Sequence, residues 1–252
     1  MTIEQRIQRY QEIEAYRSRP LLVYATSTRA GVAAMMASDA VREFVDQIEI
    51  DAIPADKRTI DILIHSTGGD GLTAWKLMSI LRERFDHVSV LVPFTAFSAA
   101  TIFALGADEI VMHPHASLGP IDPQITTQSP DGKRLNFSYE DLGAFLRFLK
   151  KEAEISGEDN VCAIVEKLFS TVDPLRVGFA QRASELATSV GARLLLTHMK
   201  ETDAKEKAQL IAENLNKSFF AHGDAVSRSR AKELNLKIAA SDPALEGLIW
   251  KA

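Results

Sequence analysis

The chain has 252 residues, 29 Lys and Arg against 34 Asp and Glu, and a hydrophobic content of 46%. This length allows one large domain or two small ones with a substantial core, and 25% charged residues fit neither a disordered nor a fibrous protein. A net charge of -5 gives no basic surface, so we expect no nucleic-acid partner. Cys162 is the single cysteine and cannot form an intramolecular disulfide, which predicts a reducing, cytoplasmic location.

The N-terminal segment is polar and charged, and it lacks the apolar core of a signal peptide. An uncharged stretch at 88–107 has the length of a membrane span. It divides at Pro93 into a β-rich run and a helix of small residues, and charged pairs bound it on both sides. A buried strand followed by a buried helix therefore explains this stretch, and we expect no integral membrane segment.

The first half of the chain predicts strands that alternate with helices. Apolar periodicity places helices at 3–16, 39–48 and 72–85, a further helix from Ser98, and strands at 21–25, 60–65, 88–92 and 109–112. This alternation is typical of βαβ units and of a mostly parallel sheet, so the expected fold class is α/β.

The second half predicts mainly helices. They are expected at 139–154, 173–188, 191–199 and 202–218, and a last helix near 226–234 leads into the short run 236–238. No linker separates domains, so we predict a single domain over 1–252. It would comprise an N-terminal helix at 3–16, an α/β core at about 20–125, a helical region at about 139–218, and a C-terminal helix and strand at about 219–252.

A diglycine turn follows the second predicted strand, in Ser66-Thr67-Gly68-Gly69-Asp70. Paired glycines let the backbone turn sharply and present N–H groups with no side chain in the way, and amides at the start of a helix favour negative charge. A plain strand-to-helix turn with Asp70 as the N-cap is an equally good interpretation. The GxGxxG and Walker patterns are absent, which argues against a nucleotide site.

A serine stands at the next strand-to-helix junction, where Ser98 is either an N-cap or a nucleophile. The two turns belong to consecutive βα units, and in a parallel sheet both lie at the carboxyl edge, where such folds bind ligands. The Ser98 hydroxyl and the N–H groups of Gly69 and Ala99 can then converge on one carbonyl. That arrangement is a nucleophile beside an oxyanion hole.

The central segment reads IDILIHSTGGDG and then PFTAFSAATIFALGADEIVMHPHASLGPIDPQ, and IEAYRSRPLLVYAT and FFAHGDAVSRSRAKELNLKI lie on either side of it. These segments resemble the serine dehydrogenase proteinase family, a branch of the Clp protease/crotonase superfamily related to signal peptide peptidase A. The resemblance implies a Clp/crotonase-like spiral of βαβ units with C-terminal helical elaborations, a serine peptidase, and a homo-oligomer. By position, Ser98 is then the nucleophile, and Gly69 and Ala99 donate to the oxyanion. The family usually has a glycine where this chain has Ala100.

A serine nucleophile needs a partner that takes its proton. Clp proteases use a histidine that follows the serine, and at the corresponding stretch, 121–124, this chain has none. Signal peptide peptidase A-like enzymes use a lysine further along, and that spacing leads to Lys150 and Lys151 on a predicted helix. A lysine base must be desolvated to be neutral, and the same two lysines fit a solvated helix face equally well.

Three histidines are alternative bases, because histidine is the commonest general base in enzymes. His113 and His115 flank Pro114 after the fourth predicted strand, and His222 lies in the closing segment that carries the resemblance. With Asp122, the first two do not have the spacing of a known zinc motif, so we expect no metal and no cofactor.

The sequence therefore predicts a serine peptidase that cleaves a peptide or protein through an acyl-enzyme on Ser98, with a lysine as the general base. Two other functions stay open. A crotonase-type acyl-CoA hydratase or isomerase would use the same two amides on a thioester enolate. A catalytically inactive assembly subunit would keep the fold for oligomerisation alone.

Overall fold

The computed structural model describes residues 1–29, 31–32, 34–49, 53, 56, 58–129, 131–155, 157–219 and 221–252. The chain forms two compact units, one made of residues 1–121 and 189–252 and the other of residues 122–188. The single domain expected over 1–252 stays a prediction.

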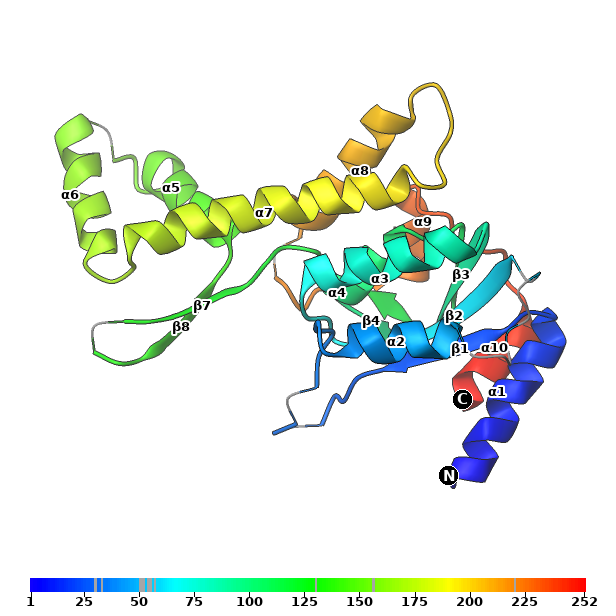
Figure 1. The fold of residues 1–252 in the computed structure, drawn as a ribbon. Coiled ribbons are helices and arrows are strands. Elements are labelled where there is room, and N and C mark those ends of the chain that lie inside the picture. The colour runs from blue at the N-terminus through cyan, green and yellow to red at the C-terminus, as the bar shows by residue number, and fades with distance from the viewer. Residues whose placement is uncertain are drawn as a thin grey trace. The chain divides into compact units, whose positions relative to one another are not determined.

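A parallel sheet forms the centre of the first unit (Figure 1). Its strands are β1 (Leu21–Ala25), β2 (Thr59–His65), β3 (His87–Val92) and β5 (Glu109–Met112), in the order β1-β2-β3-β5. All three strand pairs are parallel. The central strands are buried on both faces, which explains their nearly continuous apolar sequence. The predicted α/β class and parallel sheet are confirmed.

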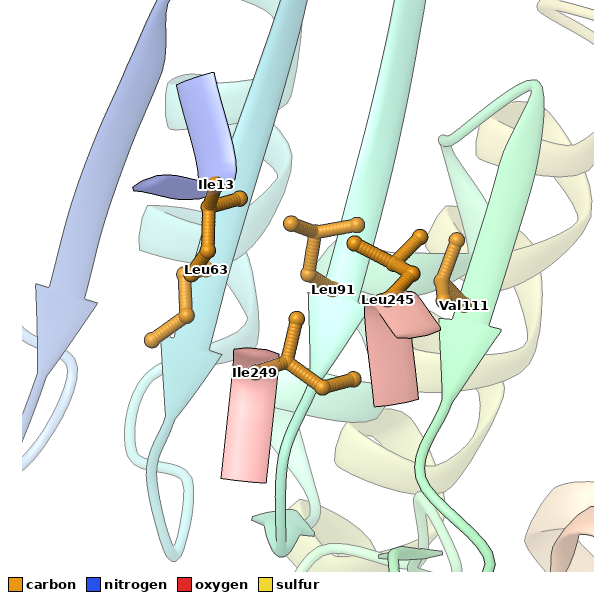
Figure 2. Packing of buried hydrophobic residues seen from close by; sticks show 6 residues of the cluster. All are labelled: Ile13, Leu63, Leu91, Val111, Leu245 and Ile249. Atoms are coloured by element: carbon orange, nitrogen blue, oxygen red, sulfur yellow. The ribbon is translucent and has the colours of Figure 1, made fainter. Parts of the chain in front are cut away.

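One face of the sheet is covered by the two ends of the chain, α1 (Ile3–Arg17) and α10 (Pro243–Lys251). Leu63, Leu91 and Val111 are register partners on three neighbouring strands, so they form a continuous apolar row across the sheet. The helices pack onto this row (Figure 2), and the buried cluster comprises Ile13, Leu63, Leu91, Val111, Leu245 and Ile249.

The other face carries α2 (Ala40–Ile48), α3 (Gly71–Arg84) and α4 (Ala99–Leu105). Each of these helices joins two strands that are adjacent in the sheet, and the chain moves across the sheet in one direction, from β1 to β5. Because such crossovers are right-handed, all three helices lie on the same face. Every residue of α4 is buried, which is why the stretch at 88–107 carries no charge. Among the helices in the described ranges, none combines the length and the apolar character needed to cross a bilayer.

A small sheet lies beyond the carboxyl ends of the main strands. It contains β4 (Thr95–Ala96), β6 (Ser117–Leu118) and β9 (Val226–Ser227), in the order β4-β6-β9. The remaining helices of this unit are α8 (Ala204–Lys217) and α9 (Arg228–Glu233). These strands have two residues each, so no periodicity in the sequence reveals them.

The second unit contains the hairpin of β7 (Ile125–Gln128) and β8 (Arg134–Phe137), then α5 (Tyr139–Lys151) and α6 (Glu158–Phe169). The sequence analysis predicted neither the hairpin nor α6, although Asp131-Gly132 is a hairpin-turn signal and Gly132 has a φ of 81°.

The prediction of two helices at 173–188 and 191–199 is wrong, because α7 (Pro174–Leu195) continues through the expected break and connects the two units. Gly191 lies inside this helix. A Cβ there would lie 3.2 Å from the Leu105 side chain and 3.4 Å from that of Ala212, so this glycine is a close-packing position rather than a helix end.

A buried polar network lies at the amino edge of the main sheet. The Arg17 guanidinium donates to Asp61 at 2.7 Å, to Glu109 at 2.8 Å and to the Ser89 hydroxyl at 3.1 Å, and Asp61 and Ser89 are fully buried. Burial raises the pKa of Glu109, but the hydrogen bond from Arg17 and the charge of Arg17 lower it by a larger amount. The pKa of Glu109 is therefore below its ordinary value. This network joins the end of α1 to three strands.

Removing the Arg17 charge should destabilise the fold, because Arg17→Leu leaves the Asp61 carboxylate buried without its main partner. We expect a loss of about 3–5 kcal/mol in the free energy of unfolding, measured by urea denaturation. Arg58→Leu is the control, since the Arg58–Asp86 pair is solvent-exposed and should cost less than about 1 kcal/mol. Equal losses in the two variants would contradict this role of the network.

Candidate active site

The diglycine turn needs glycine at both positions. Gly68 has a φ of 108° and Gly69 a φ of 148°, conformations that other residues rarely adopt. A Cβ on Gly69 would lie 2.1 Å from the carbonyl oxygen of Met36, and a Cβ on Gly68 would lie 2.6 Å from the Cβ of Ser98. The turn is therefore held between the backbone of Met36 on one side and the Ser98 junction on the other.

The hydrogen bonds of this turn leave one glycine amide available. The Met36 N–H donates to the Gly68 carbonyl at 2.8 Å, and the Asp70 N–H donates to the Met36 carbonyl at 2.8 Å. The Gly68 N–H donates to the Ser66 hydroxyl at 3.1 Å. Within the described ranges, the Gly69 N–H has no hydrogen-bond partner, so it can donate to a ligand.

Asp70 caps α3, as one interpretation of the turn expected. Its carboxylate accepts from the N–H groups of Leu72 and Thr73, each at 3.1 Å, and from the Thr73 hydroxyl at 2.7 Å. Both interpretations of the diglycine segment are thus compatible, because the cap is on Asp70 while the available amide belongs to the preceding residue.

Ser98 has an unusual backbone conformation, with a φ of 53° and a ψ of -118°. This lies outside the regions that non-glycine residues normally occupy, and such strain is concentrated at functional sites. The residue stands at the N-cap position of α4, yet its side chain makes no capping hydrogen bond. Among the described residues nothing hydrogen-bonds its hydroxyl, and the side chain is partly exposed.

The first turn of α4 presents a second amide next to Ser98. Ala99 is the first residue of the helix, and in the part of the chain that the structure describes its N–H has no partner. Ala100 is fully buried, so its methyl group packs inside the protein rather than narrowing the exposed surface beside Ser98. Ser98, Gly69 and Ala99 thus supply one hydroxyl and two N–H donors at the carboxyl edge.

Thr101 fixes the start of α4. Its buried hydroxyl donates to the carbonyl oxygen of Ala96 at 2.7 Å and accepts the N–H of Gly119 at 3.0 Å. The helix is therefore attached to β4 and to the segment after β6, which limits the movement of the Ser98 junction.

An aromatic cluster lies at the same edge, made of His65, Phe94, His113, His115 and Trp250. The His113 ring stacks on Trp250 with 4.5 Å between centroids, and the His115 ring lies 5.0 Å from His113. Phe94 bridges His65, at 6.4 Å, and Trp250, at 6.1 Å. The sequence pattern does not predict this cluster, although His65 ends β2, Phe94 lies two residues after β3, and His113 directly follows β5.

His113 and His115, two of the alternative bases predicted from the sequence, are neighbours in this cluster. The His113 Nδ1 accepts the N–H of His115 at 3.1 Å, and no hydrogen bond joins either ring to Ser98 in the described ranges. Burial lowers the pKa of His113, and the nearby His115 lowers it further. Burial also lowers the pKa of His65. The folded protein therefore favours the neutral imidazole at His65 and at His113.

These pKa shifts predict a loss of stability in acid. A histidine whose folded pKa lies below its unfolded value of 6.5 stabilises the fold above that pH, and the contribution is lost as pH falls toward the folded pKa. The urea midpoint should therefore drop between pH 7.5 and 5.5, and His113→Asn should reduce the drop. An unchanged pH dependence in His113→Asn would exclude this histidine as its source.

The predicted lysine bases lie in the second unit. Lys150 and Lys151 are exposed in the last turn of α5, so that unit by itself does not supply the desolvation that a lysine base needs. His222 lies in the loop between α8 and β9. The general base therefore stays a prediction for all five candidates.

Comparison with known proteins finds a family that is similar to part of this chain. Residues 38–140 match the sequence model of a family described as ClpP-like SDH-type serine proteinase. The matched segment contains the diglycine turn and Ser98 and ends before Lys150. The match agrees with the resemblance seen in the sequence, and it covers less than half of the chain.

Curated relatives cover more of the chain. The uncharacterized protein MJ1495 of Methanocaldococcus jannaschii is 27% identical over 184 residues, which are 73% of this chain and 53% of the relative. The uncharacterized protein MJ0137 of the same organism is 27% identical over 194 residues, which are 77% of this chain and 58% of the relative. The chain thus spans little more than half the length of these relatives.

Solved structures share the fold at low sequence identity. Two mutants of the 1510-N membrane-bound stomatin-specific protease are each 15% identical to this chain and cover 90% of it. The first has a TM-score of 0.51 with 82% of its own chain covered, and the second, in complex with a substrate peptide, has 0.50 with 77% covered. At this identity the likeness establishes the fold.

Proposed function

We propose that the chain is a serine peptidase that forms an acyl-enzyme on Ser98. The observation that carries this proposal is the contact of the diglycine turn with Ser98, whose side chain makes no capping hydrogen bond. This contact groups one hydroxyl with the two N–H donors of Gly69 and Ala99. The family match over this segment supports the same chemistry.

In the proposed reaction, the Ser98 oxygen bonds to the scissile carbonyl carbon while its proton passes to the general base. The carbonyl oxygen becomes an oxyanion that accepts hydrogen bonds from the N–H groups of Gly69 and Ala99. The base then protonates the leaving amine as the C–N bond breaks, which leaves the acyl-enzyme. Water, deprotonated by the same base, hydrolyses the ester and regenerates Ser98.

The substrate in this proposal is a peptide or protein bound in an extended conformation along a strand edge. A protease with the same fold binds a substrate peptide, which supports this class of substrate. Assembly into a homo-oligomer and a cytoplasmic location belong to the same proposal. The oligomer is supported by the family, and the location by the single cysteine.

An active-site fluorophosphonate should label the wild-type chain at Ser98, because the probe phosphonylates only an activated serine. Ser98→Ala should abolish labelling, whereas Ser229→Ala, which removes an exposed hydroxyl on α9, should leave it intact. Intact-protein mass spectrometry counts the adducts. If the wild type is not labelled, the proposal is wrong and the inactive-subunit alternative gains support. Calorimetric binding of coenzyme A would favour the crotonase alternative instead.

The base can be identified by single substitutions that remove one proton acceptor at a time. We propose a lysine, so either Lys150→Met or Lys151→Met should lower the labelling rate by about 10²–10⁴-fold. The other lysine variant then serves as the matched control, because it removes an equal charge from the adjacent position. A comparable loss in His113→Asn, His115→Asn or His222→Asn, with both lysine variants active, would assign the role to that histidine.

A further inference from the structure

Ser66 connects the two loops of the site through its backbone. It follows β2 directly and is fully buried. Its N–H donates to the Thr95 carbonyl at 2.9 Å, and its carbonyl accepts the Phe97 N–H at 3.0 Å. The segment that leads into Ser98 is therefore hydrogen-bonded to both the N–H and the carbonyl of Ser66.

The Ser66 side chain acts on the diglycine turn. Its oxygen accepts a hydrogen bond of 2.9 Å from the Thr26 hydroxyl and one of 3.1 Å from the Gly68 N–H. A hydroxyl oxygen has two lone pairs, so these two bonds use its full accepting capacity. Its oxygen also lies 3.5 Å from the carbonyl oxygen of Gly68, which its own proton can reach. Thr26 immediately follows β1, so the segments after β1 and after β2 meet at this oxygen.

This arrangement decides which glycine amide is available to a ligand. With the Gly68 N–H bound to Ser66 and the Gly68 carbonyl bound to Met36, both polar groups of Gly68 face the protein. The next amide, that of Gly69, is left without a partner in the described ranges. Without the Ser66 hydroxyl, the Gly68 N–H would be buried and unpaired, a cost that turning of the peptide would relieve.

We propose that Ser66 is a positioning residue, whose hydroxyl takes the Gly68 N–H so that the Gly69 N–H is aimed at the oxyanion. This inference rests on the proposed function, and it assigns Ser66 a role in the rate of acylation in addition to its contribution to the fold. Thr26 assists by orienting the Ser66 oxygen. Neither residue touches the reacting atoms.

The test compares Ser66→Ala with the wild type by the second-order rate constant of fluorophosphonate labelling at Ser98. Loss of one oxyanion donor lowers such rates by about 10²–10³-fold, and we expect a reduction of at least about tenfold. Ser89→Ala is the matched control, since it removes a hydroxyl from another fully buried serine, on β3 at the opposite edge of the sheet. It should lower the urea midpoint but change the labelling rate by less than about twofold.

A second pair of variants separates the hydroxyl from packing. Thr26→Val keeps the shape of the side chain and removes the donor, while Thr26→Ser keeps the donor and removes a methyl group. The probe should label Ser98 more slowly in Thr26→Val than in Thr26→Ser, even if the two variants are equally stable. The midpoint of the pH–rate profile should be unchanged in Ser66→Ala, because Ser66 acts on an amide and not on the base.

The outcomes distinguish this inference from the proposed function. A wild type that the probe does not label overturns the proposed function and this inference with it. A labelled wild type with an unchanged rate in Ser66→Ala overturns only the inference. Equal rate losses in Ser66→Ala and Ser89→Ala would reduce Ser66 to a structural residue, and so would a faster Thr26→Val than Thr26→Ser.

Discussion

The close approach between the Gly68 backbone and Ser98 is the constraint on which the candidate site depends. The two chain segments are near enough that a Cβ on Gly68 would lie 2.6 Å from the Ser98 Cβ. On the other side of the turn, the Met36 backbone leaves no room for a Cβ on Gly69. Glycine at both positions lets a strand end, a helix start and a third segment share one small volume. Side chains there would separate the hydroxyl from the amides.

The two edges of the parallel sheet have different roles. At the amino edge, Arg17 neutralises carboxylates from β2 and β5 and holds α1 against the sheet. At the carboxyl edge, backbone N–H groups and a hydroxyl lack partners in the described ranges, and Ser98 has a strained backbone. A fold can maintain such an edge only if interactions elsewhere supply the stability, and here the polar network and the core beneath α1 and α10 do so.

The aromatic cluster adds a second property to the carboxyl edge. Burial lowers the pKa of His65 and of His113 and so favours their neutral rings. Phe94 and Trp250 lie beside them and are half-exposed. The C-terminal helix contributes Trp250, so the last turn of the chain helps to shape the surface near the site.

The sequence by itself determined the strands and helices of the first half, because apolar periodicity is a local signal and those strands are buried. It also singled out the diglycine turn and Ser98, since both stand at strand-to-helix junctions of consecutive βα units. It did not reveal the two-residue strands, the aromatic cluster, or the role of Ser66. Each of these depends on residues far apart along the chain, such as Thr26 with Ser66 and His113 with Trp250. Only the tertiary structure decided that Ser98 makes no capping hydrogen bond and that Gly69 presents the available amide. Both depend on which hydrogen-bond partners the folding of the backbone places near these residues.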